Sequence, residues 1–96
     1  MNNNLGIILD PNSFKNIKEV VKKADNYNFH SAWVTELYRS SFEQLTFIAE
    51  ITKKIKIGSA VTLAFIRSPL ITAISAMDID SLSNGRLILG LGSGAI

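Results

Sequence analysis

The sequence has no cysteine and only two prolines among its 96 residues. Without cysteine there is no disulfide framework, no thiolate metal site and no cysteine nucleophile. The first residues lack the basic and apolar regions of a signal peptide, and no apolar run reaches the roughly 18 residues that span a bilayer. The longest candidate, 70–82, is interrupted by Asp78 and Asp80. We therefore expect a cytoplasmic protein that does not enter a membrane.

A strong charge of either sign is also missing. Ten basic and eight acidic side chains leave a formal net charge of +2, and the lysines are spread along the chain. This argues against nucleic-acid binding, which needs a concentrated basic surface. Hydrophobic residues make up 47% of the chain and charged residues 19%, a composition that excludes a disordered segment. A chain of this length allows one small domain at most.

The hydrophobic pattern predicts short strands that alternate with helices. Apolar or β-branched runs predict four strands, and apolar residues at helical spacing predict three helices. The expected strands are 5–9, 32–35, 55–63 and 87–91, and the expected helices are about 14–27, 41–54 and 69–82. Strands that are apolar on both faces are typical of parallel sheets with right-handed helical crossovers. This pattern leaves two architectures open, a doubly wound open sheet and a section of a β/α barrel.

Residues at the expected helix ends support these boundaries. Ser40 precedes a glutamate at the spacing of a capping box, and Ser68 precedes a proline at the first helical position. Lys53 and Lys54 are expected in the last turn of the second helix, where cations interact favourably with the helix dipole. Gly85 is suited to end the third helix.

In either architecture, ligands bind beyond the carboxyl ends of the strands. That rule selects Asp10 and Asn12, then Glu36, Tyr38 and Arg39, then Thr62, Phe65 and Arg67, and finally Gly92, Ser93 and Gly94. A carboxylate, arginines, hydroxyls, aromatic rings and a glycine turn would then share one rim. Such a rim suits a flat, anionic organic ligand.

Each of these features also has a simpler interpretation. Glu36 and Arg67 are equally compatible with solvated loop charges, and the glycines at 90–94 form either a phosphate cradle or a plain tight turn. Trp33 and Met77 are expected in the core. No His, Asp and Glu spacing indicates a metal site, and no G-x-S-x-G segment indicates a serine nucleophile. No catalytic residue can be assigned.

Three segments together resemble the luciferase-like monooxygenase superfamily, which includes reductases dependent on the deazaflavin coenzyme F-420. They are Ala-Trp-Val-Thr-Glu at 32–36, Ile-Lys-Ile-Gly-Ser-Ala-Val-Thr at 55–62 with Arg-Ser-Pro at 67–69, and the glycine-rich run at 82–94. The resemblance implies an α/β fold, the N-terminal half of a (β/α)8 barrel. The chain, 1–96, would then be a single partial domain with the first four strands and three helices.

The resemblance also implies a cofactor site in the barrel mouth, with coenzyme F-420 favoured and FMN as the alternative. Glu36 would border the ring. In F-420-dependent members a non-proline cis peptide lies behind the ring, and the matching bond here is Ala60–Val61. Thr62 would donate a hydrogen bond to the ring. The turn formed by Gly92, Ser93 and Gly94 would lie near the cofactor.

Two positions depart from the family pattern. Leu37 stands where many members have a histidine, and Ala95 stands where several have a proton-donating acid. Neither side chain can transfer a proton. The implied function is that of an oxidoreductase, transferring a hydride or activating oxygen to act on a small organic substrate. We expect the 96-residue chain to be inactive alone, because the phosphate-binding parts of the family fold belong to its second half.

Two other functions stay open. The chain could be a non-catalytic half barrel that pairs with itself or with a partner, as a homo-oligomer or with a missing C-terminal half. It could also be a nucleotide-binding module of the open-sheet type that uses the glycines at 90–94.

Overall fold

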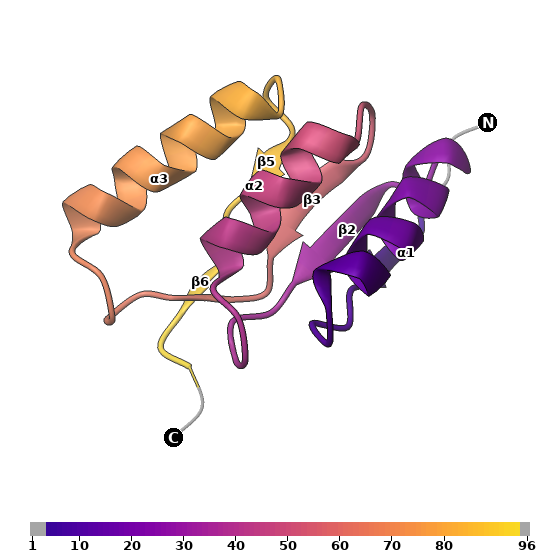
Figure 1. Ribbon diagram of the computed structural model, residues 1–96. Helices are drawn as coiled ribbons and strands as arrows, with labels where there is room; N and C mark the ends of the chain where they lie inside the picture. Colours follow the sequence, from indigo (N-terminus) through magenta and orange to yellow (C-terminus); the bar gives the residue numbers. More distant parts are fainter. Residues whose placement is uncertain (1–3, 95–96) are drawn as a thin grey trace.

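A computed structural model describes residues 4–94 as a parallel sheet covered by helices. The strands of the main sheet are β1 (Gly6–Ile8), β2 (Ser31–Val34), β3 (Lys56–Ser59) and β5 (Leu87–Ile88). The helices are α1 (Phe14–Asn26), α2 (Ser41–Ile51) and α3 (Pro69–Leu82). All three helices lie on the same face of the sheet (Figure 1). Within residues 4–94, no helix combines the length and apolar character needed to cross a membrane.

The strand order distinguishes the two architectures that the sequence leaves open. The main sheet runs β1-β2-β3-β5 and every neighbouring pair is parallel, so strands adjacent in the chain are adjacent in the sheet. A doubly wound sheet reverses direction and carries helices on both faces. Here the order never reverses, and successive right-handed crossovers place every helix on one face. The described residues therefore form a section of a β/α barrel.

The third and fourth expected strands are each broken in two, so the prediction of continuous strands at 55–63 and 87–91 is wrong. After the break come β4 (Thr62–Leu63) and β6 (Leu91–Gly92), which pair in parallel as a separate two-stranded sheet. At the break, the Ser59 hydroxyl accepts from the Gly90 N–H at 3.2 Å and donates to the Gly90 carbonyl oxygen at 3.0 Å. The Gly90 carbonyl oxygen also accepts from the Thr62 N–H at 2.7 Å, so a side chain joins the backbone ladder at this point. The Ala60–Val61 peptide bond is cis, as the family resemblance predicts.

The hydrophobic core lies between the sheet and the three helices. It is built from residues such as Ala32 and Val34, which alternate along β2 and face the helices, and from Ile17, Leu45 and Ile48 on the helices, all of them buried. Apolar residues recur every two positions on the strands and about every 3.6 positions on the helices, and the two faces that they form pack against each other.

Trp33 lies on the opposite face of the sheet, so the expectation that it belongs to the core is wrong. It stands between Ala32 and Val34 on β2 and is half-buried. Its indole lies over Gly58 of β3, and its Nε1–H donates to the Ser31 hydroxyl at 2.9 Å. The absence of a side chain at Gly58 makes room for the ring.

Replacing Gly58 by alanine should destabilise the sheet by about 1–3 kcal/mol through overpacking. The added Cβ would lie 2.6 Å from Cζ3 of Trp33 and 2.8 Å from the carbonyl oxygen of Ile88. Urea unfolding followed by circular dichroism would measure the loss. Paired with Trp33→Leu, the same glycine substitution should cost less, because only the contact with the Ile88 carbonyl remains. Equal costs in the two backgrounds would contradict the proposed clash.

The link between α2 and β3 is held by an acid on α1. The helix ends at Ile51, and the backbone N–H groups of Lys53, Lys54 and Ile55 each donate to the Asp25 carboxylate at 2.9 Å. The expectation that the two lysines form the last helical turn is therefore wrong, because Asp25 captures their N–H groups. Burial raises the pKa of Asp25, but these three donors outweigh it and lower the pKa below its usual value.

Arg86 stabilises the same segment between α2 and β3 with a second set of hydrogen bonds. It is buried, and its guanidinium donates to the carbonyl oxygens of Ala49 and Thr52 at 3.1 Å and of Ile55 at 2.9 Å. It also donates to the Thr52 hydroxyl at 2.8 Å and to the Ser83 carbonyl oxygen at 2.6 Å. One side chain thus satisfies a carbonyl in the last turn of α2, that of Ala49, together with the carbonyls of Thr52 and Ile55 in the segment that follows the helix.

The boundaries of α3 agree with the prediction, but one of its residues does not lie where expected. The Ser68 hydroxyl accepts from the Ile71 N–H at 3.1 Å, and Gly85 adopts a φ of 80° beyond the helix end. Met77 was expected in the core and is 71% exposed, so that prediction is wrong. The buried residues of α3 are Thr72 and Ile79, which define a different face of the helix.

Candidate functional site

The loops at the carboxyl ends of the strands form a rim, and an arginine joins the first two of them. Arg39, after β2, donates from Nε to the Pro11 carbonyl oxygen at 2.7 Å and from Nη2 to the Asn12 carbonyl oxygen at 3.1 Å. Its guanidinium lies 4.8 Å from the centroid of the Phe14 ring. The Asp10 carboxylate in turn accepts from the N–H and the side-chain amide of Asn12. The rim residues expected after β1 and β2 therefore lie together.

Glu36 joins the second loop to the third. One of its carboxylate oxygens accepts from the Leu63 N–H at 2.7 Å and from Nη1 of Arg67 at 2.8 Å. The other accepts from the N–H and hydroxyl of Ser41, at 2.8 and 2.9 Å, and from Nη2 of Arg67 at 2.5 Å. The Arg67 guanidinium also lies over the Phe42 ring, 4.7 Å from its centroid. The Glu36 side chain is only 6% exposed, so this acid is a buried junction and not a solvated loop charge.

These donors keep Glu36 ionised. Burial raises the pKa of its carboxyl, but the hydrogen bonds from Arg67, Leu63 and Ser41 outweigh it and lower the pKa from the usual 4.5 to about 2. Near neutral pH the group carries no proton to transfer. Its role within the described residues is that of a fixed anion that holds the β4–α3 loop against the start of α2.

A row of hydroxyls continues from Glu36 into the sheet. The Ser41 hydroxyl lies 2.8 Å from that of Thr62, which lies 2.8 Å from that of Ser59, whose partner is Gly90. Thr62 is fully buried. To donate a hydrogen bond to a ring, as the resemblance implies, Thr62 would have to give up one of these two partners. Its role toward a cofactor stays a prediction.

The glycines of the fourth strand lie against side chains of the third. A Cβ at Gly92 would be 2.8 Å from Cγ2 of Val61, and a Cβ at Gly94 would be 2.5 Å from Cδ2 of Leu63. Gly94 has a φ of 86°, a conformation that glycine adopts without cost. Val61 is 37% exposed. The two glycines therefore let β6 approach β4 closely, and Val61 and Gly92 form a smooth surface at the rim.

Exposed apolar side chains surround this surface. Leu37 and Tyr38 follow β2, and Phe65 and Ile66 follow β4, all of them well exposed. Between the two loops lies a shallow hollow of about 300 Å³, lined by Glu36, Leu37, Tyr38, Leu63, Ile66 and Arg67 among others. A hollow with apolar walls and a charged floor can hold a planar organic group.

The structure brings most of the predicted cofactor residues together. Glu36 and Thr62 are linked through Ser41, while Val61 contacts Gly92 across the neighbouring strands. Ala60 and Ser93 are exposed beside them. The departure at Ala95 falls outside the described residues. Within residues 4–94, no group of three His, Asp or Glu side chains could hold a metal ion.

Sequence reasoning missed the residues that organise the rim from within. Ser41 and Ser59 are small hydroxyl residues whose importance comes from buried partners 21 and 31 positions away in the chain. Arg67 was identified at the rim, but its pairing with Glu36 was not. The spacing of the two charges along the chain contains no signal for that pair, because only the fold brings them together.

A family model and two curated relatives match most of this chain. Residues 2–96 match the family model described as luciferase-like monooxygenase. The 5,10-methylenetetrahydromethanopterin reductase of Methanopyrus kandleri is 40% identical over 80 residues, which cover 81% of this chain and 23% of the reductase. The reductase of the same name from Archaeoglobus fulgidus is 38% identical over 76 residues, with 77% and 23% covered.

Solved structures share the fold over nearly the whole chain. The coenzyme F-420-dependent tetrahydromethanopterin reductase from Methanopyrus kandleri superposes with a TM-score of 0.88 at 37% identity, covering 99% of this chain and 28% of that one. A type II Baeyer-Villiger monooxygenase of Pseudomonas putida, in complex with FMN, superposes with a TM-score of 0.85 at 20% identity, which shows the fold alone. The chain thus spans about a quarter of the length of the relatives it matches.

Proposed function

Because the chain belongs to the luciferase-like monooxygenase family, as its N-terminal part, we propose that it forms one wall of a cofactor site in an oxidoreductase. The cofactor is coenzyme F-420, with FMN as the alternative, and the substrate is a small organic molecule. The remaining walls, including those that bind the phosphates, belong to the rest of the barrel. The chain alone is therefore expected not to catalyse.

The observation that carries this proposal is the surface formed by Val61 and Gly92. It is apolar and partly exposed, and Gly92 leaves it uncovered, because a Cβ there would lie only 2.8 Å from Cγ2 of Val61. A planar ring needs a surface of this kind to lie against. The exposed rim residues Leu37 and Phe65 supply further apolar contact area around it. The residues present therefore fit a flavin-like ring.

The preference for coenzyme F-420 rests on the closeness of the relatives. The reductase named for that coenzyme is 37% identical to this chain in the structural comparison, whereas the FMN-bound monooxygenase is 20% identical. When bound, a deazaflavin supplies hydride transfer. The residues of this chain would hold the deazaflavin in position. Glu36 accepts from the N–H of Leu63 in β4, the strand that follows Val61, and from Arg67, and neither Glu36 nor Leu37 supplies a proton.

A chimera tests the proposal. In the Methanopyrus kandleri reductase, the matching segment is replaced by this chain, and the binding of coenzyme F-420 and of FMN is followed by quenching of cofactor fluorescence. We expect the chimera to bind F-420 more tightly than FMN. Gly92→Val should weaken F-420 binding at least about tenfold, or 1.4 kcal/mol, because the isopropyl group occupies the surface over Val61.

Lys56→Val provides the control, since it places the same side chain at an exposed position at the start of β3, the opposite end of the sheet from the rim. That variant should bind like the unmodified chimera. A folded chimera that binds neither cofactor would refute the proposal. Tighter binding of FMN would support the alternative cofactor.

A further inference from the structure

Two helices of this chain end in the same way, with an asparagine in the left-handed conformation. Asn28 follows α1 with a φ of 62°, and Asn84 follows α3 with a φ of 57°. In both turns the N–H after the asparagine donates to a carbonyl oxygen in the last helical turn, at 2.9 Å after Asn28 and 2.8 Å after Asn84. This is the hydrogen bond of a Schellman motif. The two turns therefore place two asparagines in matched backbone geometry.

The side chains of the two asparagines are held differently. The side-chain oxygen of Asn28 accepts from the Lys54 ammonium group at 2.7 Å. The Asn84 side chain is exposed and has no hydrogen-bond partner among residues 4–94. Its carboxamide can therefore rotate toward the backbone of the next residue.

The residues that follow the two asparagines also differ. Phe29 packs against the hydrophobic core, so its side chain lies in a fixed place beside its backbone nitrogen. Gly85 is exposed, and even a Cβ built there would meet nothing within 4 Å. Among the asparagines of the sequence, only Asn84 precedes a glycine. The nitrogen that follows Asn84 is therefore the least hindered, and the glycine backbone can adopt many conformations around it.

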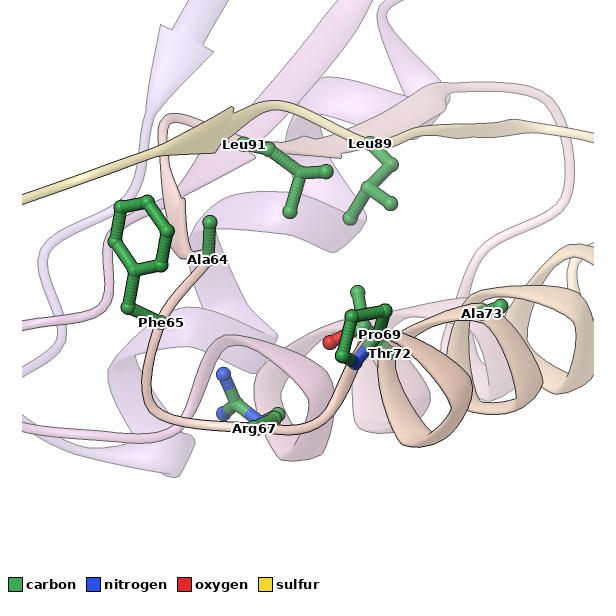
Figure 2. A pocket seen from close by; sticks show the side chains of 8 residues that line it. All are labelled: Ala64, Phe65, Arg67, Pro69, Thr72, Ala73, Leu89 and Leu91. Atoms are coloured by element: carbon green, nitrogen blue, oxygen red, sulfur yellow. The ribbon is translucent and has the colours of Figure 1, made fainter.

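The end of α3 is also easier to open than the end of α1. Asp25, in the last turn of α1, is buried and accepts three backbone N–H groups from the segment before β3. The buried residues of α3 are only Thr72 and Ile79, and Figure 2 shows the cavity of about 480 Å³ that opens between its first turns and the neighbouring strand segment. A helix with few buried contacts opens locally at low cost. The N–H after Asn84 is thus released more often than the N–H after Asn28.

We propose that Asn84 is a site of spontaneous deamidation, which proceeds through a cyclic imide when the last turn of α3 opens. The Gly85 backbone nitrogen attacks the side-chain carbonyl carbon of Asn84 and forms a new C–N bond. The bond from that carbon to the amide nitrogen breaks, and ammonia leaves with the proton that the Gly85 nitrogen gives up. Water then opens the imide at either of its carbonyl carbons, which gives aspartate or isoaspartate. Water is the only co-reactant, and nothing is oxidised or reduced.

The isoaspartate product changes the turn that positions Arg86. Its main chain passes through the former side chain, so the link from residue 84 to residue 85 is longer by a methylene group. Across this turn Arg86 donates from its backbone N–H to the Ser83 hydroxyl at 3.2 Å and from Nε to the Ser83 carbonyl oxygen at 2.6 Å. A longer link displaces Arg86 from these partners and from the end of α2. Both products also place a carboxylate at the C-terminal end of α3, where negative charge interacts unfavourably with the helix dipole.

Peptide mapping of the folded 96-residue chain, incubated in mildly alkaline buffer, tests the proposal. Mass spectrometry follows the conversion of amide to acid at Asn84 and at Asn28, and chromatography separates the aspartate and isoaspartate forms. We expect Asn84 to convert at least about tenfold faster than Asn28. The isoaspartate form, isolated by ion exchange, should unfold at a lower urea concentration than the original chain.

Asn84→Gly is the matched control, because glycine adopts a φ of 57° without cost and has no amide to lose. Its urea midpoint should stay constant throughout the incubation. Freshly prepared Asn84→Asp carries the new charge without the longer link, so it should lose less stability than the isoaspartate form. Equal conversion at Asn84 and Asn28, or none at Asn84, would overturn the proposal. A midpoint that falls equally in Asn84→Gly would show that the loss of stability does not arise at this turn.

Discussion

Replacing Arg86 by methionine is expected to lower the free energy of unfolding by about 3–5 kcal/mol, the usual cost of leaving a buried polar cluster without its charged partner. The side chain would keep much of its volume, but the carbonyl oxygens of Ala49, Thr52 and Ile55 would lose their donor. Each unsatisfied buried acceptor costs about 1–3 kcal/mol. Domains are stable by about 5–15 kcal/mol, so the variant should retain little cooperative unfolding.

Urea denaturation followed by circular dichroism measures this effect. Arg86→Lys keeps the charge but not the planar fork that reaches several acceptors, and it should fall between the original chain and Arg86→Met. Lys53→Met removes a charge from an exposed site and should change stability by less than about 0.5 kcal/mol. A loss below about 1 kcal/mol for Arg86→Met would show that Arg86 does not hold the end of α2.

Glu36 is expected to make the fold sensitive to acid. Its pKa in the folded chain is about 2, below the usual 4.5, so the stabilisation is fully present above about pH 5 and is lost as the pH falls toward 2. A shift of this size corresponds to about 3 kcal/mol. Glu36→Gln should therefore lower stability by about that amount near pH 7, since the amide cannot accept all five hydrogen bonds as an anion does.

The pH profile distinguishes this effect from a simple packing defect. Between pH 7 and pH 3 the original chain should lose more stability than Glu36→Gln, and the two curves should converge at low pH. Asp25, whose pKa is also lowered, contributes equally to both curves. Glu50→Gln, an exposed change on α2, should follow the original chain. Parallel curves for Glu36→Gln and the original chain would show that the Glu36 charge does not stabilise the rim.

The order of elements could be predicted because it depends on local pattern. The alternation around Ala32 and the serine–proline start of α3 are signals contained in a few neighbouring residues. The broken strands could not be predicted, since the Ser59 hydroxyl bonds to the Gly90 backbone across 31 positions of the chain at the break. Nor could the roles of Asp25 and Arg86, whose partners come from distant segments.

The candidate site also contains features that the sequence predicts and features that it does not. Their positions at strand ends predicted that Glu36 and Arg67 share one rim, but nothing in their spacing along the chain indicates that they pair with each other. The cis bond at Ala60–Val61 was predicted from family resemblance alone, because no property of alanine or valine favours it. The assignments of Thr62 and Ser93 to a cofactor remain predictions.

The row of hydroxyls beneath the rim has a consequence for its protons. The row runs from the Glu36 carboxylate through Ser41, Thr62 and Ser59 to the Gly90 carbonyl oxygen, so both of its ends accept. Three hydroxyl protons must then serve four close oxygen–oxygen approaches, and one approach always lacks its proton. Thr62 donates to Ser59, and Ser59 donates to the Gly90 carbonyl oxygen, so the missing proton is on one side or the other of Ser41, whose hydroxyl donates either to Glu36 or to Thr62. The heavy atoms of the rim are thus fixed, whereas its hydroxyl protons have more than one arrangement. Protonation of Glu36 would supply a fourth proton and leave a single arrangement.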